Sequence, residues 1–488
     1  MANEFQAVFS IENATQTDNG LMSKEDKTKL DGLSGDVAID LATQTTDGLM
    51  SKEDKTKLDG ISGEAIGNAT QIADGLMSKE DKTVLDSLSL HPQELVKSEE
   101  GVHGIRYFQG KLQCFDGETW ITVGGGASSG YRTMGVRIDF SDSDPQTCIT
   151  YTDDAAEMEP ESAAWDEFFG YKPCLFQNGA VVGYLNKENY AQFEDGTPVD
   201  NTSGTAGDIM VEFPRRGLKI EKEGDILTIK VTDDPENAAF DYYAHQRVQE
   251  RREAFYLGAY KGSLIEDKLY SLSGKTPTAP IGIDEARMKA QSKGEGYELG
   301  GYYQLIYLQC MYLMKYRNLN SQMALGRGFV DGNSATTLTG GTDTKGIHFG
   351  EPTGKYQMKL FGVEDVWGNI LEYIDGVRTD DAHNILTSGG NFSDTDDGYI
   401  NNGNGGFDGT VEGGYGTVAN GTSKTGFIPV EFGGTATTYF CDSVVFQKRG
   451  IGRFGGHWRS GDAAGIFHIR IYPKDSADPM VGTRIMYL

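Results

Sequence analysis

The sequence is poor in cysteine, in positive charge and in long apolar segments, and each shortage excludes a class of protein. Its 488 residues include five scattered cysteines with no CxxC pair, so we expect buried thiols rather than a zinc site. Acidic residues outnumber basic ones by 72 to 44, and the net charge of -28 would repel the phosphates of a nucleic acid. No run of about 20 apolar residues occurs, which argues against membrane insertion.

One segment near the N-terminus occurs three times, as GLMSKEDKTKLDG from Gly20 and Gly48 and as GLMSKEDKTVLDS from Gly75. In each copy Ser-Lys-Glu-Asp follows Leu-Met and predicts a helix start with the serine as N-cap. A helix of about two turns is unstable alone in water and needs partners. Parallel self-association around shared leucines would build a rod by repetition, and a solvated linker is the alternative.

Residues 14–90, which contain ATQTTDGLMSKEDKTKLDGI, resemble the short repeats of fibre and appendage proteins of tailed bacteriophages. The resemblance implies a virion fibre, normally a homotrimer, with residues 14–90 as its proximal shaft. It also implies that residues 1–13 attach to a tail or head protein of the virion. The opening MANEFQAVFS lacks the regions of a signal peptide, so we expect synthesis in the host cytoplasm and release by lysis.

Two short segments follow the repeats. Residues 91–123 contain apolar runs broken at Gln109-Gly110 and Asp116-Gly117, which predict a small β-meander. Three short strands are marginal alone, and the segment resembles the knob of phage fibres, so we expect three copies to pack together. Residues 124–130, GGGASSG, predict a flexible linker and a domain boundary.

The texture changes from Tyr131 onward, where short strand-like runs precede two helices and a loop-rich C-terminal part. The helix predicted at 301–319 is apolar nearly all round, which is typical of a buried helix. Early helices, strands and late loops indicate an α+β fold whose loops are displayed on a scaffold. Strands are predicted at 135–140, 148–152, 180–185, 208–213 and 256–262, a hairpin at 217–233, and helices at 283–292 and 301–319.

Three aromatic segments, LFGVEDVWGNILEYIDG, SGGNF and FGGHW, stand out in the C-terminal half. Together they resemble the C-type-lectin fold in the variant shared by formylglycine-generating enzymes and the variable receptor-binding proteins of diversity-generating retroelements. The resemblance implies a receptor-binding domain at 237–488, preceded by a β-rich extension at 131–236. The matching positions are Asp365, Trp367, Gly368, Asn369 and Glu372 in D-x-x-GN-x-x-E, Gly455, Gly456 and Trp458 in GG-x-W, and 482–484, ending at Arg484, in G-x-R.

We interpret these motif residues as fold determinants. Asn369 and Glu372 are expected to satisfy backbone groups in their loop, and Trp458 to anchor a buried turn. The oxidase branch of the fold uses two cysteines near its C-terminal motif, whereas GGHWRSGDAAGIFHIR has none and no cysteine follows Cys441. GxSxG, HExxH and P-loop motifs are absent too, so we expect no enzymatic activity. Glycan cleavage, which needs two placed carboxylates, is a less favoured alternative.

The resemblance to retroelement-diversified proteins also implies where a receptor would bind, because in them the exposed residues after GG-x-W contact it. Several cations within twelve residues support an anionic cell-surface ligand independently, since the arginine fork suits carboxylate and phosphate. Ion pairs across a trimer interface are the alternative. The implied contacts are His457, Arg459, Ser460, Asp462, Ala463, Gly465 and Phe467, and the cations are Lys448, Arg449, Arg453, His457 and Arg459.

A second candidate surface is the segment 391–408, NFSDTDDGYINNGNGGFD. Its oxygen ligands suit calcium, with Asp394, Asp396 and Asp397 as the core, although the spacing differs from that of an EF-hand. A solvated loop is the alternative. Tyr399 and Phe407 would stack on sugars if exposed, and would only pin the loop if buried.

The sequence therefore predicts an elongated, multidomain, trimeric fibre with a repeat shaft, a small β knob and a C-type-lectin-like tip. Its expected function is non-catalytic adhesion to a polysaccharide or protein receptor on a bacterial surface. Its expected partners are itself, a virion protein and that receptor, with no cofactor other than calcium. A structural or decorating fibre whose distal domain caps the trimer is the alternative.

Overall fold

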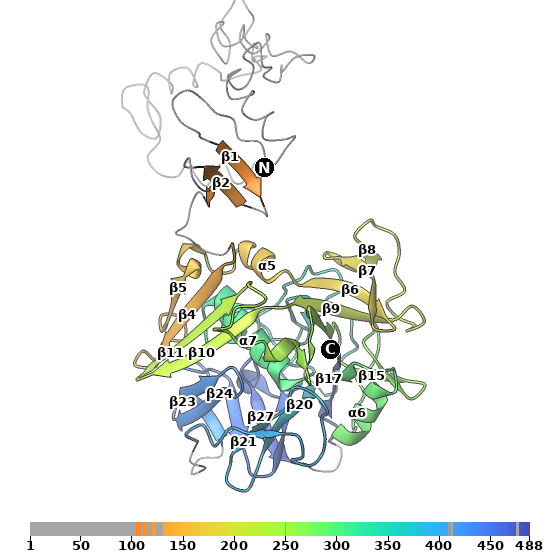
Figure 1. The fold of residues 1–488 in the computed structure, drawn as a ribbon. Helices are drawn as coiled ribbons and strands as arrows, with labels where there is room; N and C mark the ends of the chain where they lie inside the picture. Colours follow the sequence, from red (N-terminus) through yellow and green to blue (C-terminus); the bar gives the residue numbers. More distant parts are fainter. Residues whose placement is uncertain are drawn as a thin grey trace, which may run out of the picture. The chain divides into compact units, whose positions relative to one another are not determined.

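The computed structural model describes residues 104–108, 111–115, 120–122 and 130–488, apart from 249, 333, 408, 410–412 and 475–477 (Figure 1). The three repeats at 14–90 and the segment 1–13 lie outside the described residues. Contacts divide the chain into two units, Met1–Gly130 and Tyr131–Leu488.

The first unit contains an antiparallel meander of β1 (Gly104–Phe108), β2 (Lys111–Phe115) and β3 (Trp120–Thr122) in that order. The tight turns expected at Gln109-Gly110 and Asp116-Gly117 fall between these strands. The association of three copies stays a prediction.

In the second unit, one antiparallel sheet has the order β10-β11-β4-β5. Alternate residues of β4 and β11, such as Val136 and Ile229, are buried, as expected for a sheet with one face on the core. The hairpin predicted at 217–233 is present and turns through Gly224 at φ 56°. The strands are β10 (Gly217–Glu223), β11 (Ile226–Thr232), β4 (Thr133–Asp139) and β5 (Ile149–Asp153).

A second sheet combines strands from both sides of the predicted boundary at 236/237. The β-rich segment 131–236 and the segment 237–488 thus share one sheet, and buried residues of both form one core. The strand expected at 256–262 ends earlier, at Gly258. In order across the sheet the strands are β17 (Tyr297–Leu299), β29 (Ile485–Tyr487), β14 (Ala254–Gly258), β9 (Asp208–Pro214), β6 (Lys172–Gln177), β7 (Ala180–Asn186) and β8 (Asn189–Phe193).

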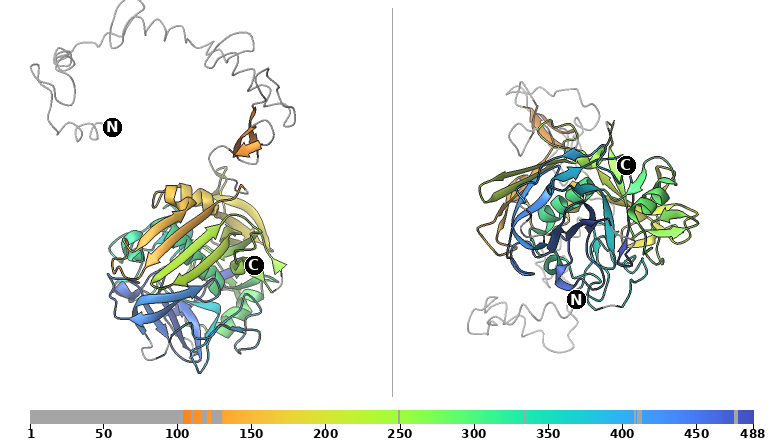
Figure 2. Two further views of the ribbon diagram at one scale, coloured as in Figure 1. Left: turned by 60° about the vertical axis from the view of Figure 1, so that its left-hand side comes forward. Right: turned by 90° about the horizontal axis from the view of Figure 1, so that it is seen from below.

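A third sheet carries most of the candidate functional residues on its strands and loops (Figure 2). Its order is β22 (Ile400–Asn401), β21 (Ile385–Thr387), β20 (Leu371–Thr379), β26 (Gly450–Phe454), β27 (Ile469–Pro473), β25 (Ser443–Phe446), β23 (Gly413–Thr422) and β24 (Gly426–Phe432), and β28 (Val481–Gly482) pairs in parallel with β20.

Helix α7 (Tyr302–Tyr316) lies in the middle of this unit and contacts both β4 and β20 (Figure 1). All its residues are buried, as the all-round apolar sequence predicted. Its C-cap, Arg317, adopts the left-handed conformation at φ 48° and ends the helix before the predicted residue 319.

Short elements complete the unit. The helices are α5 (Ala164–Phe169), α6 (Ile283–Gln291) and α8 (Ser321–Ala324), and the 3-10 turns are η1 (Asp154–Glu157), η2 (Tyr243–His245) and η3 (Gly461–Ala463). The paired short strands are β12 (Gln246–Arg247) with β13 (Glu250–Arg251), β15 (Ser263–Ile265) with β16 (Lys268–Tyr270), and β18 (Lys359–Leu360) with β19 (Val363–Glu364).

The described residues thus form a mostly β structure with buried helices, which is compatible with the predicted α+β class. Cys148, Cys174, Cys310 and Cys441 are buried free thiols, as the sequence predicted. The fibre shape and the homotrimer stay predictions.

Candidate functional site

Backbone hydrogen bonds join the two sequence motifs. The Gly368 amide donates to the Gly455 carbonyl at 3.1 Å, and the Trp458 amide donates to the Asn369 carbonyl at 3.1 Å. Gly368 and Gly455 have φ values of 84° and 90°, which glycine adopts readily. A Cβ on Gly455 would lie 2.7 Å from the Val366 carbonyl oxygen, so only glycine permits this approach. The chain after GG-x-W therefore starts from a fixed base.

Charged motif residues lie beneath this base. Nε of Arg484 donates to Oε2 of Glu372 at 2.9 Å, and Nζ of Lys261 lies 3.3 Å from the same oxygen. Glu372 therefore pairs with buried cations, and the prediction that it satisfies backbone groups was wrong. Burial lowers the pKa of Lys261 to about 8 against the opposing influence of Glu372.

Asn369 fulfils its predicted role. Its Oδ1 accepts from the Thr337 amide at 2.9 Å, and its Nδ2 donates to the Thr337 carbonyl and to the Asp365 carboxylate at 3.3 and 2.8 Å. Trp458 is 6% exposed and anchors its turn, while the Nε1 of Trp367 donates to the Gly326 carbonyl at 3.1 Å. These residues are structural supports for the loop that follows.

Residues 457–463 form an outward-facing loop held from below at several points. The His457 amide donates to the Ser460 hydroxyl at 2.8 Å, and the Gly461 amide donates to the Val330 carbonyl at 3.1 Å. Nε2 of Gln322 donates at 2.8 Å to the carbonyls of both Gly461 and Ala464. Neutral hydrogen bonds each contribute about 1 kcal/mol net, so together they fix the loop in one conformation.

This loop contains the exposed members of the predicted receptor site. Arg459 and Asp462 are exposed, whereas His457, Ser460 and Ala463 are partly exposed. Asp462 forms an ion pair with Arg327, which also chelates Asp331 through two hydrogen bonds of 2.8 Å. Sequence reasoning missed Arg327 and Gln322, because nothing local links residues near 325 to a loop 135 residues later.

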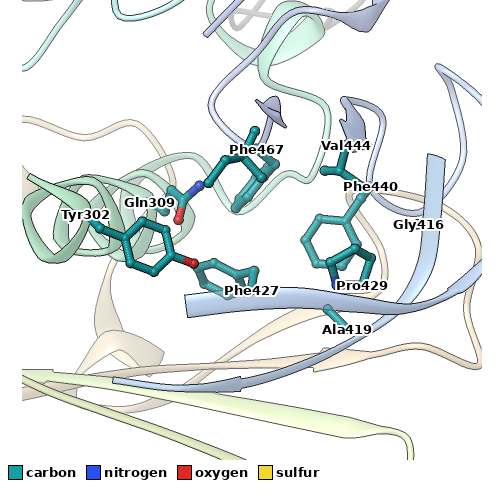
Figure 3. A pocket seen from close by; sticks show the side chains of 10 residues that line it. Tyr302, Gln309, Gly416, Ala419, Phe427, Pro429, Phe440, Val444 and Phe467 are labelled. Atoms are coloured by element: carbon teal, nitrogen blue, oxygen red, sulfur yellow. The ribbon is translucent and has the colours of Figure 1, made fainter. Parts of the chain in front are cut away.

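Gly465 and Phe467 are buried, and the prediction that they contact a receptor was wrong for the single chain. The Phe467 amide donates to Oδ2 of Asp442 at 2.8 Å, and Nε2 of Gln309 donates to the Ile466 carbonyl at 2.8 Å. The Phe467 ring is 2% exposed and meets Phe427 and Phe440 edge-on at 5.5 and 5.3 Å (Figure 3).

The space around Phe467 is a small apolar cavity of about 20 Å³. That volume holds about one water molecule, and the lining offers it few polar partners. The cavity therefore reflects packing rather than a ligand site. Its lining is Tyr302, Gln309, Gly416, Ala419, Phe427, Pro429, Phe440, Val444, Phe467 and Ile469 (Figure 3).

The five clustered cations of the sequence do not form one patch. Lys448 and Arg449 precede β26, whereas His457 and Arg459 follow it, so the strand separates the two groups. Arg449 pairs with Asp381 of its own chain through two contacts of 2.6 Å, at the surface. Only Arg453 and His457 share a pocket.

In the second candidate segment, 391–408, the aromatic residues do not extend into solvent. Phe407 is 2% exposed and packs on His383 and Phe446, which contradicts its predicted receptor contact. Tyr399 is partly exposed, and Arg378 lies 5.9 Å from its ring centre. Phe407 therefore pins the loop.

The aspartates of this segment face cations. Asp394 pairs with Arg287 and Lys474 at 2.9 and 2.7 Å, and Asp396 pairs with Arg378 at 3.2 Å. Within the described part of the chain, no group of three or more His, Cys, Asp or Glu side chains is arranged to hold a metal ion. A groove of about 300 Å³ lies beside the segment; it is lined by Tyr243, Gln246, Val248, Tyr303, 388–391, Gly398 and Ile400.

Cys441, the cysteine nearest to the C-terminal motif, is buried, and burial with nearby Asp442 raises the pKa of its thiol to about 12. It is therefore a protonated structural thiol. Among the described helices, none is both long and apolar enough to cross a membrane.

Comparisons with known proteins identify no family for this chain. No protein-family model matches it, and no curated protein matches it. A solved structure of PvdO from Pseudomonas aeruginosa is 11% identical, and the match covers 58% of this chain and 94% of that chain with a TM-score of 0.23. A similarity at this TM-score carries no inference about fold or function.

Proposed function

We propose that the protein is a non-catalytic adhesin of a virion fibre, which binds a polysaccharide or protein receptor on a bacterial surface. In this proposal the chain is a homotrimer, residues 1–13 attach to the virion, and the loop 457–463 contacts the receptor. The phage-like repeats at 14–90 supply the fibre part of the proposal.

The observation that carries the receptor-binding part is the contrast between the front and the back of the segment 457–467. Arg459 and Asp462 are exposed, while Gly465 and Phe467 are buried and bonded to the core. A fixed backbone with exposed, chemically varied side chains suits recognition, because little conformational entropy is lost on binding. It also lets exposed positions change without disturbing the fold.

Trimerisation would strengthen such a site. Three weak sites on one fibre bind a repetitive cell surface with an avidity well above that of one site, provided that all three reach it. Sedimentation equilibrium of the full-length chain tests this directly; the expected mass is three times the 53.2 kDa of one chain. A monomer would contradict the proposed fibre.

The decisive test is binding of fluorescently labelled full-length protein to a panel of intact bacterial strains. The test variant is the double substitution Arg459→Ala and Asp462→Ala. The matched control is Arg449→Ala with Asp381→Ala, which removes an equally exposed Arg–Asp pair before β26. We expect wild type and control to label certain strains and the test variant to lose at least about tenfold in binding.

Other outcomes separate the alternatives. If the test variant labels as well as wild type, the receptor site lies elsewhere, and the groove beside 391–408 is the next surface to substitute. If no strain is labelled, the structural fibre with a capping distal domain becomes the better proposal. Release of sugar from cell-surface polysaccharide would instead favour a glycan-cleaving appendage.

A further inference from the structure

A pocket of about 170 Å³ opens beside the candidate receptor loop. It contains His457, the first residue of that loop, together with two arginines from neighbouring strands. Its full lining is Leu371, Arg453, His457, Arg470, Tyr472, Asp478 and Met480.

The two arginines are direct cross-strand partners. In the antiparallel pairing of β26 with β27, Arg453 lies opposite Arg470. Side chains at opposed positions lie about 5 Å apart at Cβ, and like charges there destabilise a sheet. The repulsion is reinforced by burial, because the Arg453 side chain is 6% exposed and therefore poorly screened by water.

Neighbouring groups orient the arginines toward one concave surface. Nη2 of Arg470 donates to the Tyr472 hydroxyl at 3.1 Å, and its guanidinium lies 4.8 Å from the ring centre. The Arg453 guanidinium lies 5.9 Å from the same ring. Tyr472 thus stands between both cations, and cation–π contact with its ring holds each in place.

One acidic group lies in the pocket and sets a threshold for binding. Oδ2 of Asp478 is 4.0 Å from Nη1 of Arg453, beyond the length of a hydrogen bond. This carboxylate reduces the positive potential without cancelling it. Weak or bulky anions are therefore discouraged, and a ligand must offer good geometry to both arginines.

We propose that this pocket binds an oxyanion of the bacterial receptor, which is either a carboxylate of an acidic sugar or a phosphate of a sugar-phosphate polymer. The oxyanion accepts hydrogen bonds from Arg453 and Arg470 and relieves their mutual repulsion. The apolar side chains of Leu371 and Met480 contact the ring or chain that carries the charge. This inference rests on the proposed function and names the chemistry its receptor must have.

The proposal accounts for a strongly acidic protein meeting an acidic cell surface. With a net charge of -28, most of the chain repels anionic polymers. A local arginine pair gives attraction at one place only, which favours one orientation of contact. Sequence reasoning overlooked Arg470 and Tyr472, although both face the same side of the alternating strand segment IRIY.

The first measurement is isothermal titration of the full-length protein with sodium glucuronate, with glycerol 3-phosphate and with uncharged glucose. We expect one of the two anions to bind and glucose not to bind, and the preferred anion distinguishes carboxylate from phosphate. Arg470→Gln should weaken that binding at least about tenfold, whereas the matched control Arg449→Gln should leave it unchanged. Equal binding by the Arg470→Gln variant, or no binding of either anion, overturns the proposal.

A stability measurement guards against a merely structural role for the arginine pair. In anion-free buffer, Arg470→Gln should unfold at the same temperature as wild type or higher, because it removes a repulsion. The preferred anion should raise the Tm of wild type and not that of the variant. A lower Tm of the variant in anion-free buffer would assign the pair to the fold and contradict the proposal.

Cell labelling separates this inference from the proposed function. If wild type labels bacteria and Arg470→Gln labels them much more weakly, both stand. If the two label equally, the pocket inference is wrong and the adhesin proposal remains. If no strain is labelled, the adhesin proposal fails, and with it the assignment of the oxyanion to a receptor.

Discussion

The amide of Phe467 donates to the carboxylate of Asp442 at 2.8 Å, and this bond separates the part of the loop that can vary from the part that cannot. The Ser321 hydroxyl strengthens the anchor, because it accepts from the Ile466 amide at 3.2 Å and lies 3.3 Å from the same carboxylate. Residues 457–463 lie on the outer side of this anchor, and 465–467 belong to the core.

Gly465→Ala should destabilise the second unit by about 1–3 kcal/mol. A Cβ there would lie 2.2 Å from both carboxylate oxygens of Asp442, so the anchor must shift. Chemical denaturation measures the effect. Gly433→Ala is the matched control, because Gly433 also has a positive φ, 127°, but has no atom within 4 Å of the new Cβ. Equal losses in the two variants would mean that backbone strain, and not the Asp442 contact, limits position 465.

Asp442→Asn should flatten part of the pH dependence of stability. Burial raises the pKa of Asp442 from 3.8 to about 8 in the folded chain, against the lowering effect of the Phe467 amide and Ser321. Between about pH 4 and pH 8 the folded state therefore holds a proton that the unfolded state releases. The contribution of Asp442 to stability falls as pH rises through this window, by on the order of 5 kcal/mol.

The measurement is the free energy of unfolding at pH 5 and pH 8 for wild type and the Asn variant. Wild type should lose more stability than the variant between these values. Glu364, whose pKa burial also raises to about 8, contributes in the same direction and is present in both proteins, so the difference isolates Asp442. Parallel pH profiles for the two proteins would contradict the prediction.

Glu372→Gln should cost about 3–5 kcal/mol of stability, because it leaves Arg484 and Lys261 buried without their carboxylate. Asp381→Asn breaks the Arg449 pair, whose side chains are 75% and 68% exposed, and should cost less than about 1 kcal/mol. Denaturant unfolding of both variants tests the contrast. A small loss for Glu372→Gln would show that water or a shifted side chain satisfies the cations.

Phe407→Ala should lower stability by about 3–5 kcal/mol, since it removes a buried ring. The Tm of the full-length chain reports this loss. Binding to bacteria, measured below the Tm of the variant, should be unchanged because the ring does not reach the surface. Loss of labelling in a variant that remains folded would instead give Phe407 a role in recognition.

Local patterns in the sequence predicted most elements of the second unit. The hairpin β10–β11 follows from alternating apolar residues around Glu223-Gly224-Asp225, and α7 from a run that is apolar on every face. The order of the motifs marked 457–467 as one candidate segment. Periodicity reports which face of an element is apolar, and this information is local.

The sequence could not divide that segment, because burial depends on residues far along the chain. Phe467 is covered by Phe427 and Phe440, and Asp442 fixes its amide, so an aromatic residue in a polar loop belongs to the core. Strand register likewise decides that Arg453 faces Arg470 rather than Arg449. The sequence by itself thus determined the elements, the repeats and the motif order, whereas only tertiary packing decided which candidate residues meet solvent and which charges meet each other.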